Sequence, residues 1–495
     1  MSDFYVLGVD QSTQGTKAVL FDCGGKLIER YDLPHKQIIS EEGWVSHDPS
    51  EICGNVVKAC RGVIEKAGIE RSSVRCMGIT NQRETSVVWD RKTGEPLADA
   101  IVWHCNRATD ICEKIDEMYH CADLIYERTG LKLSPYYPAS KYAWFLQNIP
   151  GVKEKAEVGD AAFGTIDSWV VFKLTGGKRF VSDASNSART QLFALKEMAW
   201  DKEICGYFGI DPDLLPEVLD SDAVFGETDL DGFLEKPIPI HGVLGDSNGA
   251  LFGHNCRQAG KIKTTYGTGS SVMMNIGSEP TQSRHGLSTS VAWKIGGKTA
   301  YVFEGNINYT GAVITWLKDE VGLISSAGET EELAFAANPE DRTYIVPAFS
   351  GLGAPWWKSD ARAMIFGMNR GTGRKELVKA ACECIVYQIN DLVEAMRADT
   401  GLDVPELNVD GGPTRNRYLM QFQSDMSRVQ INIPNAEELS VIGASYLAGI
   451  SAGLYDSETV YQAMEYHHYH PKMDEENRKR RLDGWKEAIQ TVCTQ

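Results

Sequence analysis

Residues 5–22 read Tyr-Val-Leu-Gly-Val-Asp-Gln-Ser-Thr-Gln-Gly-Thr-Lys-Ala-Val-Leu-Phe-Asp. Apolar runs at 6–9 and 18–21 flank a short polar segment. Gly15, close to the middle, permits the positive φ that a tight hairpin requires. The stretch therefore predicts a strand, a turn and a second strand.

The predicted turn carries groups that bind anionic oxygens. It offers backbone N–H groups, the hydroxyls of Ser12, Thr13 and Thr16, and the cation Lys17. Asp10 differs from them, because a carboxylate is repelled by phosphate unless a divalent cation lies between the two. Asp10 therefore indicates a Mg²⁺ ion held largely through water. This stretch alone leaves open a solvated hairpin with an ordinary turn aspartate.

Length and composition indicate a globular protein of two lobes. The chain has 495 residues, too many for one ordinary core, and 42% of them are hydrophobic. No apolar run is long enough for a bilayer span, and the N-terminus does not have the pattern of a signal peptide, so we expect a cytoplasmic protein without a membrane partner. The net charge of −18 argues against a nucleic-acid partner, because phosphate backbones bind clustered Lys and Arg.

The polar segment 81–84, Asn-Gln-Arg-Glu, separates two apolar runs at 75–80 and 85–90 that predict buried strands. Polar side chains in such a place cost desolvation unless they bind something. Arg83 offers a forked donor and Glu84 a pair of acceptors, which together suit the adjacent hydroxyls of a polyol. An ion pair within the protein at the end of a strand is the alternative.

Two further features of the first half concern its aromatic residues and a helix. Trp103, with Tyr136 and Tyr137, could form an apolar wall for the carbon skeleton of a ligand, or could belong to the core. A start signal at Asp160 and the apolar residues after it predict a helix over 160–174.

A carboxylate follows the apolar run 238–244, in the sequence Gly245-Asp246-Ser247. Open α/β sheets place catalytic groups at the carboxyl edge of a strand, where a helix begins, so Asp246 is a candidate for catalysis. Composition then shifts toward glycine and polar residues, and we place a domain boundary there, between lobes 1–252 and 253–495.

The second half repeats the opening theme. Residues 261–265, 266–271 and 272–276 again predict strand, glycine turn and strand, and the strand at 407–409 leads through Asp-Gly-Gly at 410–412 into a helix. A glycine turn before a helix N-terminus suits a nucleotide. The duplication suggests two similar α/β lobes that close on a cleft, with the nucleotide between them.

Seven segments keep a fixed order along the chain. They are Gly-Val-Asp-Gln-Ser-Thr at 8–13, Gly-Ile-Thr-Asn-Gln-Arg-Glu-Thr at 78–85, Gly-Thr-Ile-Asp-Ser-Trp at 164–169, Tyr-Gly-Thr-Gly at 266–269, Phe-Ser-Gly-Leu-Gly-Ala-Pro at 349–355, Asp-Gly-Gly at 410–412 and Tyr-Leu-Met-Gln-Phe-Gln-Ser-Asp at 418–425. Together they resemble the FGGY carbohydrate kinases, and among these the glycerol kinases most closely.

The resemblance implies two ribonuclease-H-like lobes, related to actin, hinged around an ATP cleft. It implies an ATP-dependent kinase of a small polyol, first of all glycerol, which becomes glycerol 3-phosphate. Asp246 corresponds to the catalytic base and Asp10 to the Mg²⁺-associated aspartate. The polyol contacts correspond to Arg83, Glu84, Trp103, Tyr136, Asp246, Ser247 and Ser271. The nucleotide contacts correspond to Ser12, Thr13, Gln14 and Lys17 in the phosphate loop, and to Gly267, Thr268, Gly311, Thr315, Gly412 and Asn416.

The chain departs from the glycerol kinases at several positions. Lys17 stands where they usually have Arg, Ser247 where they have Gln and Ser271 where they have Phe, while His104 and Asn106 replace Gln and Arg. These changes imply a roomier, more polar pocket, so a four- or five-carbon polyol or ketose such as erythritol, xylulose or ribulose is an alternative acceptor. The Met-His-Gly of xylulose kinases is absent at the corresponding place, which favours glycerol.

A non-catalytic actin-like ATP-binding module is a second class of function, but it does not explain the polar segment 81–84 or Asp246. We expect a homodimer or a homotetramer. Residues 226–236 lack the loop through which some bacterial glycerol kinases bind fructose 1,6-bisphosphate, so we do not expect that regulation.

Overall fold

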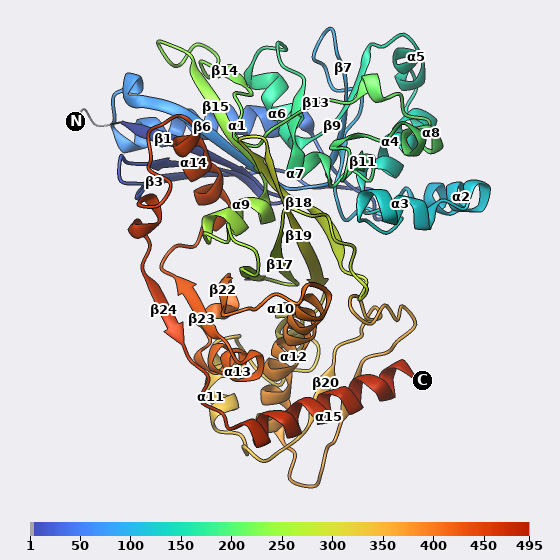
Figure 1. Ribbon diagram of the computed structural model, residues 1–495, viewed down its shortest axis with the longest axis vertical. Coiled ribbons are helices and arrows are strands. Elements are labelled where there is room, and N and C mark those ends of the chain that lie inside the picture. Colours follow the sequence, from blue (N-terminus) through green and yellow to red (C-terminus); the bar gives the residue numbers. More distant parts are fainter. Residues whose placement is uncertain (1–3, 495) are drawn as a thin grey trace.

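The computed structural model describes residues 4–494, so the first three residues of the predicted first lobe and the last residue of the second lie outside the described part. In Figure 1 the first half of the chain fills the upper part of the molecule, and most of the second half fills the lower part. Each half contains one large mixed sheet.

The first sheet has the strand order β14-β15-β6-β1-β2-β3. Its centre is parallel, because β6 runs parallel to both β1 and β15, while β2 and β3 extend it by antiparallel pairing. The strands are β1 (Tyr5–Gln11), β2 (Gly15–Phe21), β3 (Leu27–Pro34), β6 (Val74–Asn81), β14 (Gly226–Thr228) and β15 (Ile238–Gly245).

The second sheet repeats this plan in the order β18-β19-β17-β16-β22-β23-β24. Again a hairpin, here β16 and β17, lies beside a parallel pair, here β22 and β23. This repetition confirms the predicted α/β architecture of two lobes. The strands are β16 (Ile262–Tyr266), β17 (Ser270–Gly277), β18 (Ser288–Ile295), β19 (Lys298–Ile307), β22 (Glu406–Asp410), β23 (Gln430–Pro434) and β24 (Tyr466–Tyr469).

The smaller sheets mostly belong to the first half. Five short strands form the order β4-β5-β8-β7-β9, and three two-stranded ladders complete the set. The strands are β4 (Ile38–Ile39), β5 (Val45–His47), β7 (Ser86–Asp90), β8 (Ala100–Ile101), β9 (Ala161–Thr165), β10 (Val181–Asp183), β11 (Phe193–Ala194), β12 (Ala199–Trp200), β13 (Glu217–Leu219), β20 (Tyr344–Val346) and β21 (Met364–Phe366).

Helices pack on both large sheets and around the smaller ones. They are α1 (Pro49–Ala67), α2 (Thr109–Tyr119), α3 (Ala122–Thr129), α4 (Pro138–Asn148), α5 (Val152–Glu157), α6 (Ile166–Leu174), α7 (Ala184–Ser187), α8 (Lys202–Tyr207), α9 (Asp246–Gly253), α10 (Gly311–Asp319), α11 (Glu329–Phe335), α12 (Arg374–Thr400), α13 (Arg417–Ser427), α14 (Leu439–Ser451) and α15 (Glu475–Cys493).

Two expectations from the sequence are wrong in detail. The predicted helix over 160–174 starts too early, because residues 161–165 form β9, paired with β7, and only 166–174 are helical. Gly15 does not have a positive φ. A Cβ atom there would lie 2.5 Å from the carbonyl oxygen of Leu33 in β3, so glycine is needed for the close approach of a third strand.

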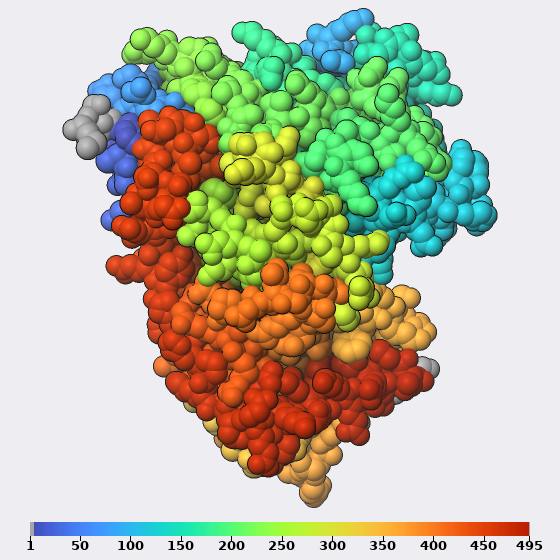
Figure 2. All heavy atoms as spheres, viewed as in Figure 1, coloured from blue at the N-terminus to red at the C-terminus, as the bar shows by residue number. Residues whose placement is uncertain are grey.

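One late helix returns to the first lobe. Helix α14 packs on α9 and on β1, β6 and β15, and Figures 1 and 2 show this segment, in red, against the blue N-terminal strands. A shared core joins Val6 and Phe21 of the first sheet with Val441 and Tyr446 of α14.

The domain boundary between residues 252 and 253 stays a prediction. Helix α14 belongs to the second half of the sequence but packs on the first lobe. In the described part of the chain no helix is both long and apolar enough to cross a membrane.

Candidate active site

The turn between β1 and β2 is held in one shape by hydrogen bonds. Ser12 donates to the carbonyl of Gly15 through its backbone N–H (2.9 Å) and its hydroxyl (3.0 Å). Gln82, directly after β6, donates to the carbonyl of Ser12 (3.2 Å). This fixed turn therefore lies against the polar segment 81–84, and only Gln14 of its residues is exposed.

Asp10 lies at the end of β1 with 6% of its surface exposed. Burial raises the pKa of Asp10 to about 7; the ammonium of Lys17 opposes this, while the carboxylates of Asp246 and Glu438 add to it. No group of residues 4–494 makes a hydrogen bond with its Oδ1. A buried carboxylate with an unpartnered oxygen and other carboxylates nearby suits a divalent cation.

Lys17 faces a carboxylate from the second half of the chain. Its Nζ lies 2.8 Å from Oε2 of Glu438 and 4.0 Å from Oδ2 of Asp10. Arg30 of β3 also pairs with Glu438, at 2.6 Å. The cation predicted for the phosphate loop is thus held at the start of α14.

The turn between β16 and β17 is built into the start of α10. The backbone N–H of Gly311 donates to the carbonyl of Gly267 (3.0 Å), and that of Ala312 donates to the carbonyl of Thr268 (3.0 Å). The hydroxyl of Thr310 also donates to the carbonyl of Gly267. Gly267, Thr268 and Gly311, which are far apart in the sequence, therefore form one unit.

A pocket of about 910 Å³ opens beside this unit. Four of the predicted nucleotide contacts line it, namely Gly311, Thr315, Gly412 and Asn416. Ile314, Ile385 and Leu419 give it an apolar surface of the kind that holds a base. Ser12, Thr13, Gln14 and Lys17 do not line it.

A second cavity, of about 660 Å³, shares Gly412 and Arg415 with this pocket. It is also lined by Gly411 and by Glu438, the partner of Lys17. The two cavities therefore extend from the α10 and α13 region toward the first turn.

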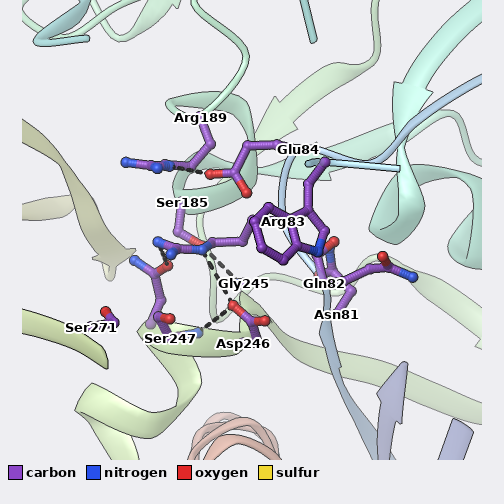
Figure 3. Close-up of polar contacts among 12 residues, drawn as sticks. Asn81, Gln82, Arg83, Glu84, Ser185, Arg189, Gly245, Asp246, Ser247 and Ser271 are labelled. Carbon is purple, nitrogen blue, oxygen red and sulfur yellow. Dashed lines mark hydrogen bonds and ion pairs between the residues drawn. The ribbon is translucent and has the colours of Figure 1, made fainter. Parts of the chain in front are cut away.

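Asp246 and Arg83 come together because β15 and β6 are parallel neighbours. Gly245 at the end of β15 is in register with Asn81 at the end of β6, so the residues that follow both strands meet at one edge. Nε of Arg83 lies 3.2 Å from Oδ1 of Asp246, as Figure 3 shows. The Arg83 side chain is only 6% exposed, whereas that of Asp246 is 39% exposed and can reach a ligand.

Arg83 and Glu84 also take part in buried ion pairs, but not with each other. Glu304 of β19 binds both terminal nitrogens of Arg83, at 2.6 and 3.1 Å. Arg189, after α7, pairs with Glu84 at 2.5 Å and with Glu304 at 3.0 Å. The structure is thus compatible with both interpretations of the polar segment, an ion pair within the protein and a polyol site. Arg83 is paired with Glu304, and it also faces the accessible Asp246.

Trp103 and Tyr136 stand together as an aromatic pair. Their ring centroids are 5.5 Å apart, and Nε1 of Trp103 donates to the hydroxyl of Thr13 in the first turn (2.9 Å). Tyr137 is buried and packs edge-to-face against Tyr136, with ring centroids 5.2 Å apart. The aromatic wall predicted for an acceptor therefore touches the predicted phosphate loop.

The two serines that depart from the family pattern lie in the same place. The backbone N–H of Ser247 donates to Oδ1 of Asp246 (2.6 Å), and the hydroxyl of Ser271 donates to Glu304 (3.2 Å). Neither side chain fills space as a long amide or an aromatic ring would.

Three charged residues of this site are missing from the sequence-based interpretation: Lys141, Arg189 and Glu304. Each is buried and bonded to a predicted site residue. A charged residue inside an apolar segment, such as Glu304 in Tyr-Val-Phe-Glu-Gly at 301–305, is the signal that could have identified one of them.

Comparison with known proteins assigns the chain to a family. Two family models match it, the N-terminal domain of the FGGY family of carbohydrate kinases over residues 5–253 and the C-terminal domain over residues 262–452. Glycerol kinase 1 of Thermotoga maritima is 46% identical over 493 residues, which cover 99% of this chain and 100% of the relative. Glycerol kinase of Thermoanaerobacter pseudethanolicus is 43% identical over 98% of both chains.

Solved structures agree with this assignment. The crystal structure of Plasmodium falciparum glycerol kinase with ADP has a TM-score of 0.94 and 34% identity, over 99% of this chain and 98% of that one. A xylulose kinase from Lactobacillus acidophilus, at 21% identity over 98% of this chain and 97% of that one, has the same fold with a TM-score of 0.87. The protein belongs to the FGGY family of carbohydrate kinases.

Proposed function

We propose that this FGGY kinase transfers the γ-phosphoryl group of ATP to a hydroxyl of glycerol, giving glycerol 3-phosphate. The single observation that supports it most is the accessible Asp246 carboxylate beside the buried Arg83, next to the turn that carries Asp10 and Lys17. The glycerol kinases that match the chain over almost its whole length support the choice of acceptor.

Each predicted group has one role in this reaction. Asp246 takes the proton of the acceptor hydroxyl as its oxygen attacks the γ-phosphorus, and the bond to the leaving ADP oxygen breaks. Arg83 and Glu84 bind the neighbouring hydroxyls, and Trp103 with Tyr136 covers the carbon atoms. Lys17 and the N–H groups of the first turn hold the phosphates.

The nucleotide would lie in the pocket lined by Gly311 and Asn416. Asp10 would hold Mg²⁺ through water, and the ion would neutralise charge on the phosphate oxygens. The unpartnered Oδ1 of Asp10 supports this role. Assembly into a homodimer or a homotetramer stays a prediction.

Longer acceptors are the alternative, because the small side chains of Ser247 and Ser271 lie beside Asp246 and Glu304. Glycerol, erythritol, xylitol, xylulose and ribulose should be compared in a coupled assay of ADP release. We expect the highest kcat/KM for glycerol. A higher value for another compound would replace glycerol as the acceptor, and ATP hydrolysis that no polyol affects would favour a non-catalytic module.

Replacing Asp246 tests the reaction itself. Asp246→Asn keeps the shape of the side chain but cannot take a proton, so kcat should fall by about 10²- to 10⁴-fold, while calorimetric titration should give unchanged affinities for ATP and glycerol. Asp110→Asn on the exposed start of α2 is the control and should keep full activity. An active Asp246→Asn variant would remove Asp246 from the role of base.

A further inference from the structure

A carboxylate from the second lobe reaches into the acceptor site of the first. Glu304 lies on β19, and its side chain is completely buried. Its Oε1 is 2.6 Å from Nη2 of Arg83 and its Oε2 is 3.1 Å from Nη1, so the carboxylate grips both ends of the guanidinium. Such paired contacts fix the plane of an arginine side chain as well as its position.

Glu304 is the middle of a chain of alternating charges. The order is Glu84, Arg189, Glu304, Arg83 and Asp246, with contacts of 2.5, 3.0, 2.6 and 3.2 Å. Burial alone would raise the pKa of Glu304, but Arg83 and Arg189 hold it well below its usual range, so the carboxylate is ionised. Both ends of the chain are residues for which we propose contact with the acceptor.

The geometry divides the donors of Arg83 between two tasks. Glu304 occupies one side of the guanidinium through Nη1 and Nη2, and this turns Nε toward Asp246. Without the carboxylate, two arginines would remain buried side by side with like charges and without a shared partner. Arg83 could then no longer hold one orientation beside Asp246.

We propose that Glu304 is a positioning residue that orients Arg83 for the acceptor, and that the second lobe thereby completes the acceptor site of the first. This inference rests on the proposed function. Glu304 itself needs no contact with the acceptor, because it acts through Arg83. The position of β19 relative to the first lobe then determines how well the acceptor binds.

The test is a comparison of Glu304→Gln with a matched control. Glu304→Gln removes the charge at constant size, so we expect KM for glycerol to rise about 10- to 100-fold, while KM for ATP stays within about twofold. Glu383→Gln is the control, because Glu383 is equally buried and pairs with Arg481 at 3.1 Å. Both variants should lose thermal stability, but only Glu304→Gln should change KM for glycerol.

A double-mutant cycle separates positioning from a general loss of structure. Arg83→Ala alone should raise KM for glycerol, and adding Glu304→Gln should change it little further, because the carboxylate acts through that arginine. Effects of the two changes that simply multiply would overturn the inference. So would an unchanged KM for glycerol in Glu304→Gln.

If Glu304→Gln does not fold, Glu304→Asp decides. The shorter carboxylate keeps the charge but cannot span both arginines, so KM for glycerol should rise by an intermediate factor; an unchanged value would overturn the inference. A wild-type protein that does not phosphorylate glycerol would instead overturn the proposed function, and the cycle would then be measured with the acceptor found in the substrate comparison.

Discussion

Lys141 shows how a single buried charge can organise the proposed acceptor pocket. Its side chain, on α4, is fully buried, and Nζ donates to the carbonyls of Tyr136 (2.6 Å), Trp103 (2.9 Å) and Glu84 (3.4 Å). These three carbonyls belong to segments far apart in the sequence, and Glu84 has a positive φ of 61°. An ammonium group has three hydrogens, which matches the three acceptors.

Replacing Lys141 should loosen the pocket. Lys141→Met removes all three donors at similar size, so we expect KM for glycerol to rise about tenfold, with Lys58→Met on the exposed face of α1 as the unchanged control. In the wild type, burial lowers the pKa of Lys141 to about 7. Above that pH the ammonium of Lys141 loses a hydrogen-bond donor and its charge, so KM for glycerol should rise with pH in the wild type. In Lys141→Met this contribution to the pH dependence of KM should be absent.

The same group makes a prediction about stability that does not depend on activity. Between about pH 7 and 10.5 the unfolded chain binds a proton that folded Lys141 does not. The free energy of unfolding should therefore rise with pH over this interval, by at most about 1.4 kcal/mol per pH unit from this residue. Denaturant titrations at several pH values measure this rise, which should be smaller in Lys141→Met than in the wild type. An equal rise with pH in the two proteins would contradict the lowered pKa.

Sequence reasoning selects the candidate site residues that lie at the ends of apolar strands and misses charged residues that lie inside other elements. Asp10, Arg83 and Asp246 stand out because each interrupts the apolar pattern at a strand end. Lys141 lies in a helix, where a lysine usually indicates a solvated face. Glu304 does interrupt an apolar segment, but its pairing with Arg189 becomes apparent only when the fold brings the two together.

At the scale of elements, two helices approach each other unusually closely. A Cβ atom on Gly443 of α14 would lie 1.9 Å from the carbonyl oxygen of Gly249 in α9. Helix α9 begins with Asp246, the proposed base. The way α14 packs on α9 therefore also determines where the Asp246 side chain points. The glycine is therefore needed for this packing, and through α9 it also supports the role proposed for Asp246.

Gly443→Ala should push the two helices apart. We expect the free energy of unfolding to fall by about 1–3 kcal/mol, and kcat to fall more than KM, because the backbone that carries Asp246 moves. Gly54→Ala in α1 is the control: its Cβ would meet nothing within 4 Å, so it should stabilise the protein by about 0.5–1 kcal/mol. Urea unfolding and steady-state kinetics measure both effects, and a fully stable, active Gly443→Ala variant would contradict this account.

The sequence predicts both hairpins correctly because apolar runs on either side of a glycine turn are strong local signals. The start of the 160–174 segment is a different case. The local sequence at 161–165, Ala-Ala-Phe-Gly-Thr, has no preference strong enough to exclude a helix. This segment forms a strand because it pairs with β7, more than 70 residues earlier. Likewise, the need for glycine at position 15 comes from the close approach of β3 and not from the conformation of its own turn.

At the scale of the whole molecule, the two lobes are not independent units. The core that contains Val6 and Phe21 also contains Met273, Val302 and Tyr446 from the second half. Lys17, Arg30 and Glu438 join the halves by charge, and Arg83 with Glu304 joins them again inside the site. Contacts between residues so distant in sequence leave no local pattern, so sequence reasoning could divide the chain but not predict this crossing.

We therefore expect one cooperative unfolding transition. In differential scanning calorimetry the wild type should melt in a single step, and ADP at about 100 times its Kd should shift the whole transition, because binding adds about 2.7 kcal/mol to the folded state. Two separate peaks, only one of which responds to ADP, would show that the lobes unfold independently.

The return of α14 also matters while the protein is being made. The ribosome releases β1, β2 and β6 early, yet the helix that covers their apolar face is translated only after most of the chain has emerged. The nascent polypeptide therefore presents a bare hydrophobic surface throughout much of its synthesis, which is the condition under which chains aggregate or engage chaperones.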